Sequence, residues 1–412
     1  MKRAGRIAPQ PWMTHPATRA VVQALAGGGG RVMFVGGCVR DAVLGKAIKD
    51  IDIATPDPPD RVTALLVAAG IKAVPTGIDH GTVTAVTRAR HFEITTLRRD
   101  VETYGRRAKV AFTDDWAADA ARRDFTMNAL YLAPDGALYD PTGGLPDLKA
   151  GRIRFIGTAA ARIAEDYLRI LRFFRFTAWY GKAPPRAVDL AACRRLAPRM
   201  ERLAAERIAG ELLKLLAAPA PAPIVRQMAD AGVLAVVLPE ARDIERLVRL
   251  CRIDRATPAA TRPFRRLAAL LPDRAEVGVE VAGRLRLSNA ERDRLVAALA
   301  TPDVAAEAPV GRLKVLAYRA GAPAVVDRLL LVHAAPPAAA RARLKTQLAA
   351  LRRWRRPIFP IKGGELIARG LPRGPEVGRL MTVLEDWWIE NDFKPERDAL
   401  LGRLDALVQP ER

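Results

Sequence analysis

Two aspartates separated by one isoleucine, Asp50 and Asp52, are the residues of this chain best suited to chemistry. The segment around them is strand-like, and alternation along a strand puts both carboxylates on one face. Neighbouring carboxylates repel each other, so their pairing favours a cation between them. Magnesium, a hard divalent ion that takes oxygen ligands, is the expected partner.

A Gly-Gly pair comes shortly before these aspartates. Gly36 and Gly37 follow a short apolar run, and Arg40 comes three residues later. Glycine lets the backbone approach a phosphate, and Arg40 adds a positive charge. Singly, a Gly-Gly pair is usually a turn and Asp-x-Asp is common on solvated loops. Together they indicate phosphoryl or nucleotidyl transfer.

The order GGCVRD followed by DIDIAT resembles motif A of the class II nucleotidyltransferases, which include tRNA CCA-adding enzymes and bacterial poly(A) polymerases. Family members supply a third acidic residue from a later strand, and Glu93 in HFEITT is the candidate; the alternative is a surface glutamate paired with an arginine. The resemblance implies that Asp50, Asp52 and Glu93 are catalytic and hold two Mg²⁺ ions. Such ions activate an attacking RNA hydroxyl and stabilise the departing pyrophosphate.

The segment 119–130, DAARRDFTMNAL, resembles motif B. Helical spacing predicts that Asp124 and Asn128 lie on one face of a helix. The resemblance implies that Arg123 and Asn128 contact the triphosphate and Asp124 the ribose hydroxyl. Arginine suits phosphate oxygens, and a carboxylate accepts from a hydroxyl. Without the preceding motif, this string would be interpreted as a solvated helix face.

The segment EDYLRILRFFRF resembles motif D. Asp166 and Arg169 are three residues apart, which predicts that both leave one face of a helix. They could bind the amine-plus-acceptor edge shared by cytosine and adenine, with Arg172 nearby; the alternative is an intrahelical salt bridge. The segment 204–216 resembles motif E, in which Glu206 and Arg207 would brace the selecting helix. The segment 140–157 resembles motif C, a hinge.

The pattern along the chain changes near Gly151, from short strand-like runs to helix-period Ala, Leu and Arg. This predicts an α+β chain. The resemblance implies a small nucleotidyltransferase head with a polymerase-beta-like sheet, followed by an all-helical neck, body and tail. The expected divisions are a head at 1–150, a neck at 151–217, a body at 218–301 and a tail at 302–412.

The formal charge of +22 and the pI near 10.7 favour a polyanionic partner such as RNA, the alternative being arginine-rich composition with solvated charges. No apolar run is long enough to span a bilayer, and MKRAGRIAPQPW has no secretory core. The three cysteines are widely spaced, which argues against disulfides or a zinc site. We therefore expect a cytoplasmic protein with no membrane partner and no obligate protein partner.

Two further segments carry expectations. The segment 97–116 corresponds to the flexible loop that relatives use when changing from C to A addition, and it is not obviously shortened; the alternative is a mobile basic loop. Near the C-terminus, LRRWRRPIFPIKGG is basic with an aromatic among the arginines. The residues expected to contact RNA there are Arg352, Arg353, Arg355, Arg356 and Lys362.

These features predict a tRNA nucleotidyltransferase of the CCA-adding type that uses CTP and ATP, with tRNA as its partner. A poly(A) polymerase is the closest alternative, although the segment after the aspartates lacks that family's usual basic strand. An enzyme adding only the final A is a second alternative. A non-catalytic RNA-binding relative is the third, and the intact aspartates argue against it.

Overall fold

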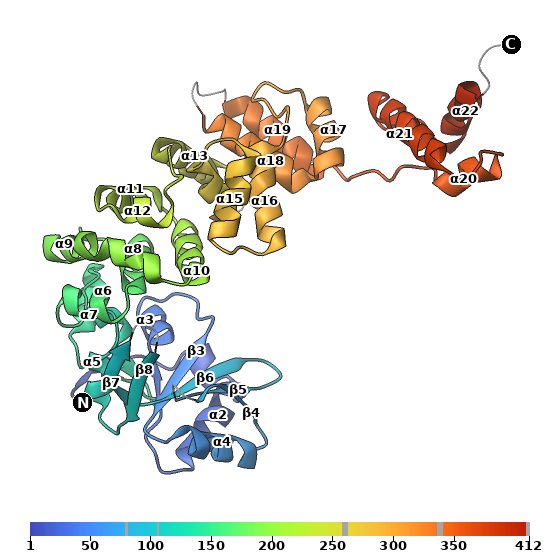
Figure 1. Cartoon of the computed structure of the whole chain (residues 1–412). Helices are drawn as coiled ribbons and strands as arrows, with labels where there is room; N and C mark the ends of the chain where they lie inside the picture. Colours follow the sequence, from blue (N-terminus) through green and yellow to red (C-terminus); the bar gives the residue numbers. More distant parts are fainter. Residues whose placement is uncertain (79–80, 105–106, 258–262, 336–340, 409–412) are drawn as a thin grey trace. The chain divides into compact units, whose positions relative to one another are not determined.

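The chain was analysed as a computed structural model that describes residues 1–78, 81–104, 107–257, 263–335 and 341–408 (Figure 1). It divides into two compact units, Met1–Ala241 and Arg242–Arg412, which are described separately. The predicted α+β fold class is confirmed, because the sheets lie in the first part of the chain and the remainder is helical. The four-part division predicted from the sequence stays a prediction.

The first unit is built on an eight-stranded mixed sheet with the order β1-β10-β9-β2-β3-β6-β5-β4. The strands β3 and β6 run parallel, and the other neighbours are antiparallel. The alternation of β6 buries Phe92 and Ile94 and exposes Glu93, as the sequence pattern requires. The strands are β1 (Arg3–Arg6), β2 (Met33–Val35), β3 (Ile51–Thr55), β4 (Lys72–Gly77), β5 (Thr82–Val86), β6 (His91–Thr96), β9 (Tyr131–Leu132) and β10 (Ala137–Tyr139).

The helices of this part pack against the sheet or connect its strands. Trp116 on α5 packs edge-to-face on Tyr131 of β9, within a core that includes Met33 and Val35 of β2. Gly36 has a φ of 74°, so it permits the turn from β2 into α3 that a side chain would strain. The helices are α1 (Pro11–Thr14), α2 (Pro16–Ala26), α3 (Gly37–Val43), α4 (Pro59–Ala68), α5 (Trp116–Ala121) and the 3₁₀ turn η2 (Thr126–Asn128).

The segment predicted to correspond to the relatives' flexible loop, 97–116, contains a two-stranded antiparallel hairpin. Its strands are β7 (Arg98–Tyr104) and β8 (Arg107–Phe112), and residues 105–106 lie outside the described part of the chain. The register shifts between residues 100 and 102, which marks a bulge or irregularity in the ladder. The described backbone of this segment is therefore paired β structure, and its role in changing from C to A addition stays a prediction.

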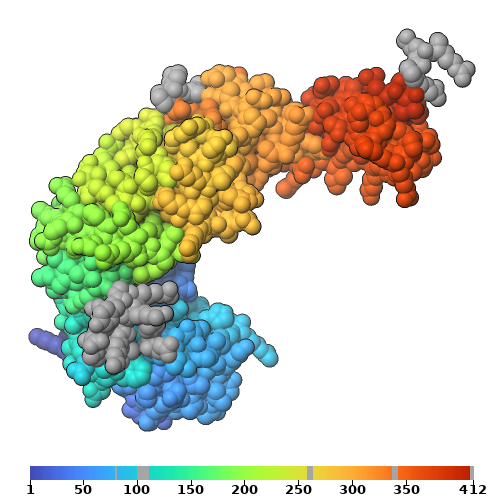
Figure 2. Space-filling view, viewed as in Figure 1, coloured from blue at the N-terminus to red at the C-terminus, as the bar shows by residue number. Residues whose placement is uncertain are grey.

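The helices that follow the head, green in the space-filling view, lie directly against its blue and teal surface (Figure 2). Aromatic side chains make part of this contact. Phe125 of the head lies 4.7 Å, ring to ring, from Phe155, which in turn stacks at 5.3 Å on Phe173 of α8. All three rings are buried, so the contact between the two parts is stabilised by burial of aromatic surface as well as by the ring geometry. The helices are α6 (Gly144–Ala150), α7 (Ala159–Glu165), α8 (Leu168–Tyr180), α9 (Ala187–Leu196), η3 (Ala197–Arg202), α10 (Ala205–Leu216), α11 (Ala222–Asp230) and α12 (Val233–Val237).

The regular secondary structure among the described residues of the second unit is all helical, and the unit contains a buried ionic cluster. Arg265, 1% exposed, pairs with both Asp254 and Asp327 at 3.2 Å. No helix among the described residues combines the length and the apolar character that a bilayer crossing requires. The first helices of the unit are α13 (Ile244–Ala256), α14 (Pro263–Ala269), α15 (Ala275–Arg284), α16 (Asn289–Ala300), α17 (Val310–Ala320), α18 (Ala322–His333) and α19 (Arg341–Arg353).

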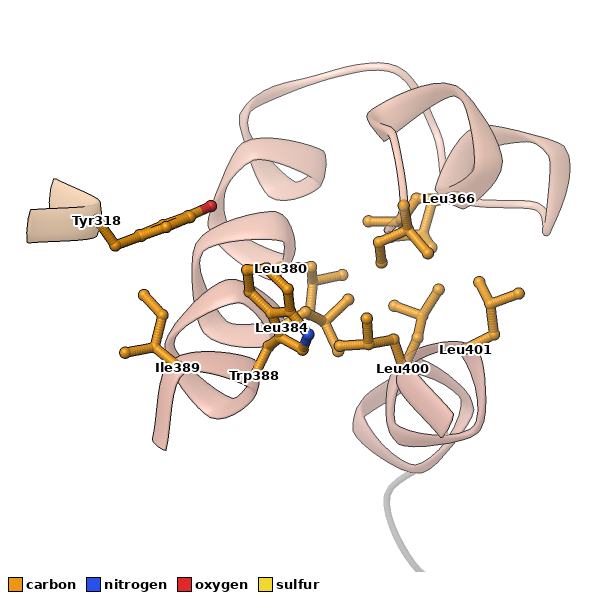
Figure 3. Close-up of a cluster of buried hydrophobic side chains, with 11 residues drawn as sticks. Tyr318, Leu366, Leu380, Leu384, Trp388, Ile389, Leu400 and Leu401 are labelled. Carbon is orange, nitrogen blue, oxygen red and sulfur yellow. The ribbon is translucent and has the colours of Figure 1, made fainter. Parts of the chain in front are cut away.

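The last three helices share a hydrophobic core of their own (Figure 3). Leu384 and Trp388 of α21 are buried together with Leu400 of α22 and Leu366 of α20. Tyr318 of α17 belongs to the same cluster, with its ring centroid 5.7 Å from that of Trp388. These helices are α20 (Gly363–Ala368), α21 (Pro375–Glu390) and α22 (Arg397–Val408).

Candidate active site

Two neighbouring strands bring the predicted catalytic carboxylates together. In the parallel ladder of β3 and β6, Asp52 pairs directly with Glu93. Ile51 and Ile53 are buried on either side of Asp52, which fixes its direction through the alternation of the strand. Asp50 comes immediately before β3 and is exposed. All three carboxylates line one cavity of about 730 Å³.

The charge of Asp52 is unfavourable in this environment. Burial, then the neighbouring charges of Glu93 and Asp50, raise the pKa of Asp52 to about 6, although Arg123 and Arg40 act in the opposite direction. A positive charge placed among the three carboxylates would restore the ionised form. The site therefore has the electrostatic character of a cation site.

The donor set suits a hard divalent ion, because it consists of carboxylate oxygens. Among the described residues, no three His, Cys, Asp or Glu side chains are already arranged as a metal-binding group. Asp50, Asp52 and Glu93 nevertheless line the same cavity, and the pKa of Asp52 reflects their mutual repulsion. These three residues fit the expected Mg²⁺ by chemistry and by position along the cavity.

The Gly-Gly turn and Arg40 lie beside the carboxylates. A side chain at Gly36 would contact Arg123 at 3.6 Å and Asp52 at 3.7 Å, so this glycine lies where the backbone meets the site. Arg40 is 7% exposed, donates to Asn128 Oδ1 at 2.9 Å and forms two hydrogen bonds with Asp41. These contacts hold the buried guanidinium in one orientation.

Asp119 is a buried acceptor that the sequence analysis missed. It accepts hydrogen bonds from Arg122, from Arg123 and, at 2.6 Å, from the hydroxyl of Tyr131. Burial alone would raise the pKa of Asp119, but the two guanidiniums hold it well below its usual range. Arg123 is thereby fixed toward the cavity. The spacing of Asp119 to the two arginines, three and four residues, was the available signal.

Asp124 and Asn128 meet as predicted, although not on one helix. Asn128 Nδ2 donates to Asp124 at 3.1 Å, but α5 ends at Ala121 and Phe125 is extended, forming a β-bridge with Phe155. The helical spacing assumed for this segment was therefore wrong. The pairing arises because Asn128 is in a separate 3₁₀ turn that folds back toward Asp124.

Asp124 is also joined to the neck. Arg172 of α8 donates to it from Nε at 2.7 Å and approaches from Nη2 at 2.6 Å. Burial would raise the pKa of Asp124, but Arg172 and the hydrogen bonds to its carboxylate lower it. Asp124 is therefore a charged acceptor, held by one neck arginine.

The predicted arrangement of Asp166 and Arg169 on one helix face was wrong. Asp166 lies between α7 and α8 with φ −152° and ψ 108°, and its carboxylate accepts from the amide of Leu168 at 3.1 Å. Arg207 of α10 donates to it at 2.6 Å, while Arg169 pairs with Glu165 instead. Neither the shared helix face nor the intrahelical Asp-Arg salt bridge is present. The spacing of three residues was misleading because Asp166 precedes the first helical residue of α8.

The head and neck residues predicted as catalytic or nucleotide-binding nevertheless all line the cavity of about 730 Å³. Figure 1 shows α8 and α10 on the side of the head where α3 and β3 lie. The cavity lining also includes residues that were not predicted as its contacts. These are Arg122, Leu168, Arg175, Phe176, Arg207 and Lys214.

The predicted RNA-contacting residues belong to the second unit, and all are exposed. Arg352 and Arg353 end α19, and Lys362 precedes α20. Arg356 lies over the ring of Tyr318, with its guanidinium carbon 4.8 Å from the centroid. Arg355 is in the same connecting segment between α19 and α20. Their exposure makes all five side chains accessible to a partner.

Two family models match the chain. The first, the poly A polymerase head domain, matches residues 32–154, and the second, described as the probable RNA and SrmB-binding site of polymerase A, matches residues 190–244. The mitochondrial CCA tRNA nucleotidyltransferase 1 of Danio rerio is 34% identical, covering 90% of this chain and 86% of the relative. The CCA-adding enzyme of Leuconostoc citreum is 31% identical, covering 98% of each.

Solved structures agree with these sequence relatives. The Bacillus stearothermophilus CCA-adding enzyme in complex with CTP has a TM-score of 0.71 and 25% identity, covering 96% of this chain and 99% of its own. The Thermotoga maritima CCA-adding enzyme complexed with tRNA has the same fold, with a TM-score of 0.66 and 22% identity over 98% of this chain and 97% of that one. By its sequence relatives, its fold and the residues of its cavity, the chain belongs to the CCA-adding family of class II nucleotidyltransferases.

Proposed function

We propose that this chain completes tRNA 3′ ends, adding C, C and A from CTP and ATP without a nucleic-acid template. The observation that carries the proposal is the single cavity, in which the three carboxylates face the neck arginines and Asp166. Relatives named for this reaction cover most of the chain, and neighbours of the same fold are described with CTP, ATP and tRNA. The reaction joins an RNA 3′-hydroxyl to the nucleotide α-phosphate and releases pyrophosphate.

The carboxylates would do the catalytic work by holding Mg²⁺. When bound, two such ions lower the pKa of the attacking hydroxyl and neutralise the charge that develops on the leaving pyrophosphate. Asp50, Asp52 and Glu93 would provide the oxygen ligands. The backbone at Gly36 and Gly37 would orient the phosphates, supported by the buried charge of Arg40.

The neck would hold and select the nucleotide. Arg123, Asn128 and Arg172 would orient the triphosphate, while Asp124 would accept from the ribose hydroxyl. The Asp166 carboxylate would accept from the exocyclic amine of cytosine or adenine, and Arg169 would donate to the adjacent ring nitrogen. Uracil and guanine present a carbonyl and an N–H there, so each would leave unpaired groups at a cost of about 1 to 3 kcal/mol apiece.

To discriminate between bases in this way, the side chains of Asp166 and Arg169 would need fixed orientations. Arg207 is joined to Asp166 by two hydrogen bonds, and Arg169 donates to the carbonyls of Arg162 and Arg122. These contacts support a fixed template, because charge-assisted hydrogen bonds from Arg207 hold the Asp166 carboxylate in one orientation. The bracing role expected for Arg207 is consistent with this geometry.

Full CCA addition is favoured over the alternatives. A poly(A) polymerase shares the head, but the relatives that cover most of this chain are CCA-adding enzymes. An enzyme that adds only A is likewise not favoured by those relatives. A non-catalytic relative would have no need for three carboxylates whose repulsion raises the pKa of Asp52.

Each of the four predicted parts of the chain would have a separate role in the reaction. The head at 1–150 would catalyse transfer, the neck at 151–217 would select the nucleotide, and the body at 218–301 would connect it to an RNA-binding tail at 302–412. Arg352, Arg353, Arg355, Arg356 and Lys362 would contact tRNA phosphates. A cytoplasmic location is supported by the three widely spaced, buried cysteines, Cys38, Cys193 and Cys251, which suit a reducing compartment.

The test is a set of tRNAs that end before the first C, after one C and after both C residues. Each is incubated with CTP alone, ATP alone and both nucleotides, with Mg²⁺ present. The proposal requires C on the first two substrates and A only on the third. Incorporation of A on every substrate, or long A tracts, would indicate one of the alternatives.

A further inference from the structure

A second cavity of about 470 Å³ adjoins the first at the catalytic carboxylates. The two cavities have six lining residues in common. These are Gly37, Arg40, Asp50, Asp52, Arg175 and Lys214. The reaction joins two reactants at these carboxylates, and the first cavity contains the groups assigned to the nucleoside triphosphate. The second cavity is therefore adjacent to the reacting centre and is available to the second reactant, the RNA that carries the attacking 3′-hydroxyl.

The charge of the second cavity suits a phosphodiester. Lys46, Lys49 and Lys214 line it, and all three are exposed. Among its described lining residues, the only acid besides Asp50 and Asp52 is Asp41, whose two oxygens accept from Arg40 at 3.0 Å and 2.9 Å. The lysine charges are thus left available for an anion, and each could contact a backbone phosphate.

Two adjacent aromatic residues at the end of α8 complete the lining. The Trp179 indole N–H donates to the carbonyl of Lys214 at 2.8 Å, and the side chain remains 36% exposed. Tyr180 holds two cations, with the Arg40 guanidinium and the Lys46 ammonium each 4.2 Å from its ring centroid. The indole is therefore fixed and partly open, whereas the phenol ring is already occupied.

We propose that the second cavity binds the 3′-terminal nucleotide of the RNA being extended. Its base would stack on Trp179, and its phosphate would lie near Lys46 and Lys49. A fixed aromatic ring beside lysines is the usual means of binding single-stranded nucleic acid without sequence preference. Such tolerance is needed, because the terminal nucleotide changes after every addition. The inference rests on the proposed function, which makes the RNA 3′-hydroxyl the nucleophile.

The first experiment separates the two substrates kinetically. With a tRNA acceptor minihelix lacking CCA, Trp179→Ala should raise the KM for RNA by at least about fivefold, since stacking one base contributes ~1 to 3 kcal/mol. The KM for CTP should stay within twofold of the parent. Trp179→Phe keeps a ring without the hydrogen bond and should restore most of the RNA affinity. Val67→Ala, at a 62% exposed side chain on α4, is the matched control.

The second experiment tests the lysines by salt. Lys46→Gln with Lys49→Gln should lower the slope of log K for the minihelix against log salt by ~0.7 for each single-strand phosphate that the variant no longer neutralises. Lys72→Gln, an exposed lysine of β4 that lines neither cavity, should leave the slope unchanged.

Three results would overturn the inference while the proposed function stands. The RNA KM could be unchanged in Trp179→Ala, or the CTP KM could rise instead, which would make the cavity a triphosphate site. Equal defects in Trp179→Phe and Trp179→Ala would assign the residue to bracing α10 through Lys214. A parent protein that extends no RNA with CTP or ATP would overturn the proposed function and this inference together.

Discussion

At the scale of single residues, Asp52, proposed as a catalytic carboxylate, occupies a position that disfavours its charge. Its pKa near 6 exceeds the ordinary value of 3.8 because the side chain is buried next to Glu93 and Asp50. Between these two pH values the folded protein binds more protons than the unfolded chain, so stability decreases as pH rises through this window. The ionised carboxylate therefore destabilises the metal-free protein at neutral pH.

Replacing Asp52 with Asn should stabilise the protein while abolishing its reaction. With a chelator at pH 7.5, we expect unfolding of Asp52→Asn to need ~1 to 2 kcal/mol more than the parent, and this gain should vanish near pH 4. Nucleotide incorporation should fall by at least a hundredfold, with tRNA binding retained because phosphate contacts supply most of it. Urea titrations, single-turnover assays and filter binding measure these quantities. Activity within tenfold of the parent would rule out the carboxylate site.

The proposed base choice depends on two further residues, Asp166 and Arg169. Removing both side chains, Asp166→Ala with Arg169→Ala, should reduce the preference for CTP over UTP by at least tenfold, because a good bidentate contact contributes ~1 to 3 kcal/mol of discrimination. Competition between labelled CTP and UTP on one tRNA measures the ratio. Arg195→Ala on α9 lies outside this cavity and serves as the control. A slower enzyme with unchanged preference would assign the pair to bracing the helices.

At the scale of elements, the hairpin β7–β8 is connected by hydrogen bonds to Arg169, the arginine proposed to read the base. Arg122 donates from Nε to the carbonyl of Arg98, at the start of β7, and to Asp119. The carbonyl of Arg122 in turn accepts from Arg169 at 3.3 Å. A continuous chain of hydrogen bonds therefore runs from the hairpin to the residue proposed to read the base.

Loss of the Arg122 side chain should disturb selection more than transfer. In Arg122→Ala, Asp119 retains Arg123 and Tyr131, so the carboxylate site should keep its geometry. We expect the ratio of CTP to UTP use to fall by about threefold to tenfold, with single-turnover CTP incorporation reduced less. Arg122→Lys tests whether charge alone is sufficient, since lysine cannot reproduce two directed contacts. A uniform loss of rate with unchanged selectivity would contradict this coupling.

The elements also explain which predictions were possible from the sequence. Asp52 and Gly36 could be predicted because each depends on its own stretch of chain. The alternation of side chains along a strand sets the direction of Asp52, and the absence of a side chain lets Gly36 adopt its turn. The break in the helix before α8 was missed because two contacts of the Asp166 carboxylate accompany it. One is with the amide of Leu168, and the other is with Arg207, which lies 41 residues away in the sequence. The spacing of Asp119 to Arg122 and Arg123 was visible in the sequence, but its burial, which distinguishes it from a solvated acid, depends on packing with Tyr131.

At the scale of the whole molecule, the residues proposed to bind RNA lie in a unit whose last helices share a hydrophobic core with Tyr318 of α17. Cutting the chain after Leu351 would remove Trp388, which packs on Tyr318 of α17, so truncation would confuse RNA binding with unfolding. Substitution is the better test because the arginines between α19 and α20 are exposed.

Replacing the four arginines of the tail segment with glutamine should weaken tRNA binding but not the chemistry. The substitutions are Arg352→Gln, Arg353→Gln, Arg355→Gln and Arg356→Gln. Each duplex phosphate that is no longer neutralised should lower the slope of log K against log salt by ~0.9. Incorporation at saturating tRNA should stay within threefold of the parent. Unchanged affinity and slope would show that these side chains are simply solvated.

The pairing of Asp52 with Glu93 across β3 and β6 determines which deletions in the chain the active site can tolerate. Because alternate residues of β6 are buried, a one-residue slip would expose Phe92 and Ile94 and turn Glu93 inward. A chain in which β6 is shifted by one residue therefore does not fold stably, because Phe92 and Ile94 no longer reach the core. A folded protein with Glu93 out of register is thus not expected. A single-codon deletion between β5 and β6 should be tolerated when the turn absorbs it, whereas one within β6 should remove folding and catalysis together.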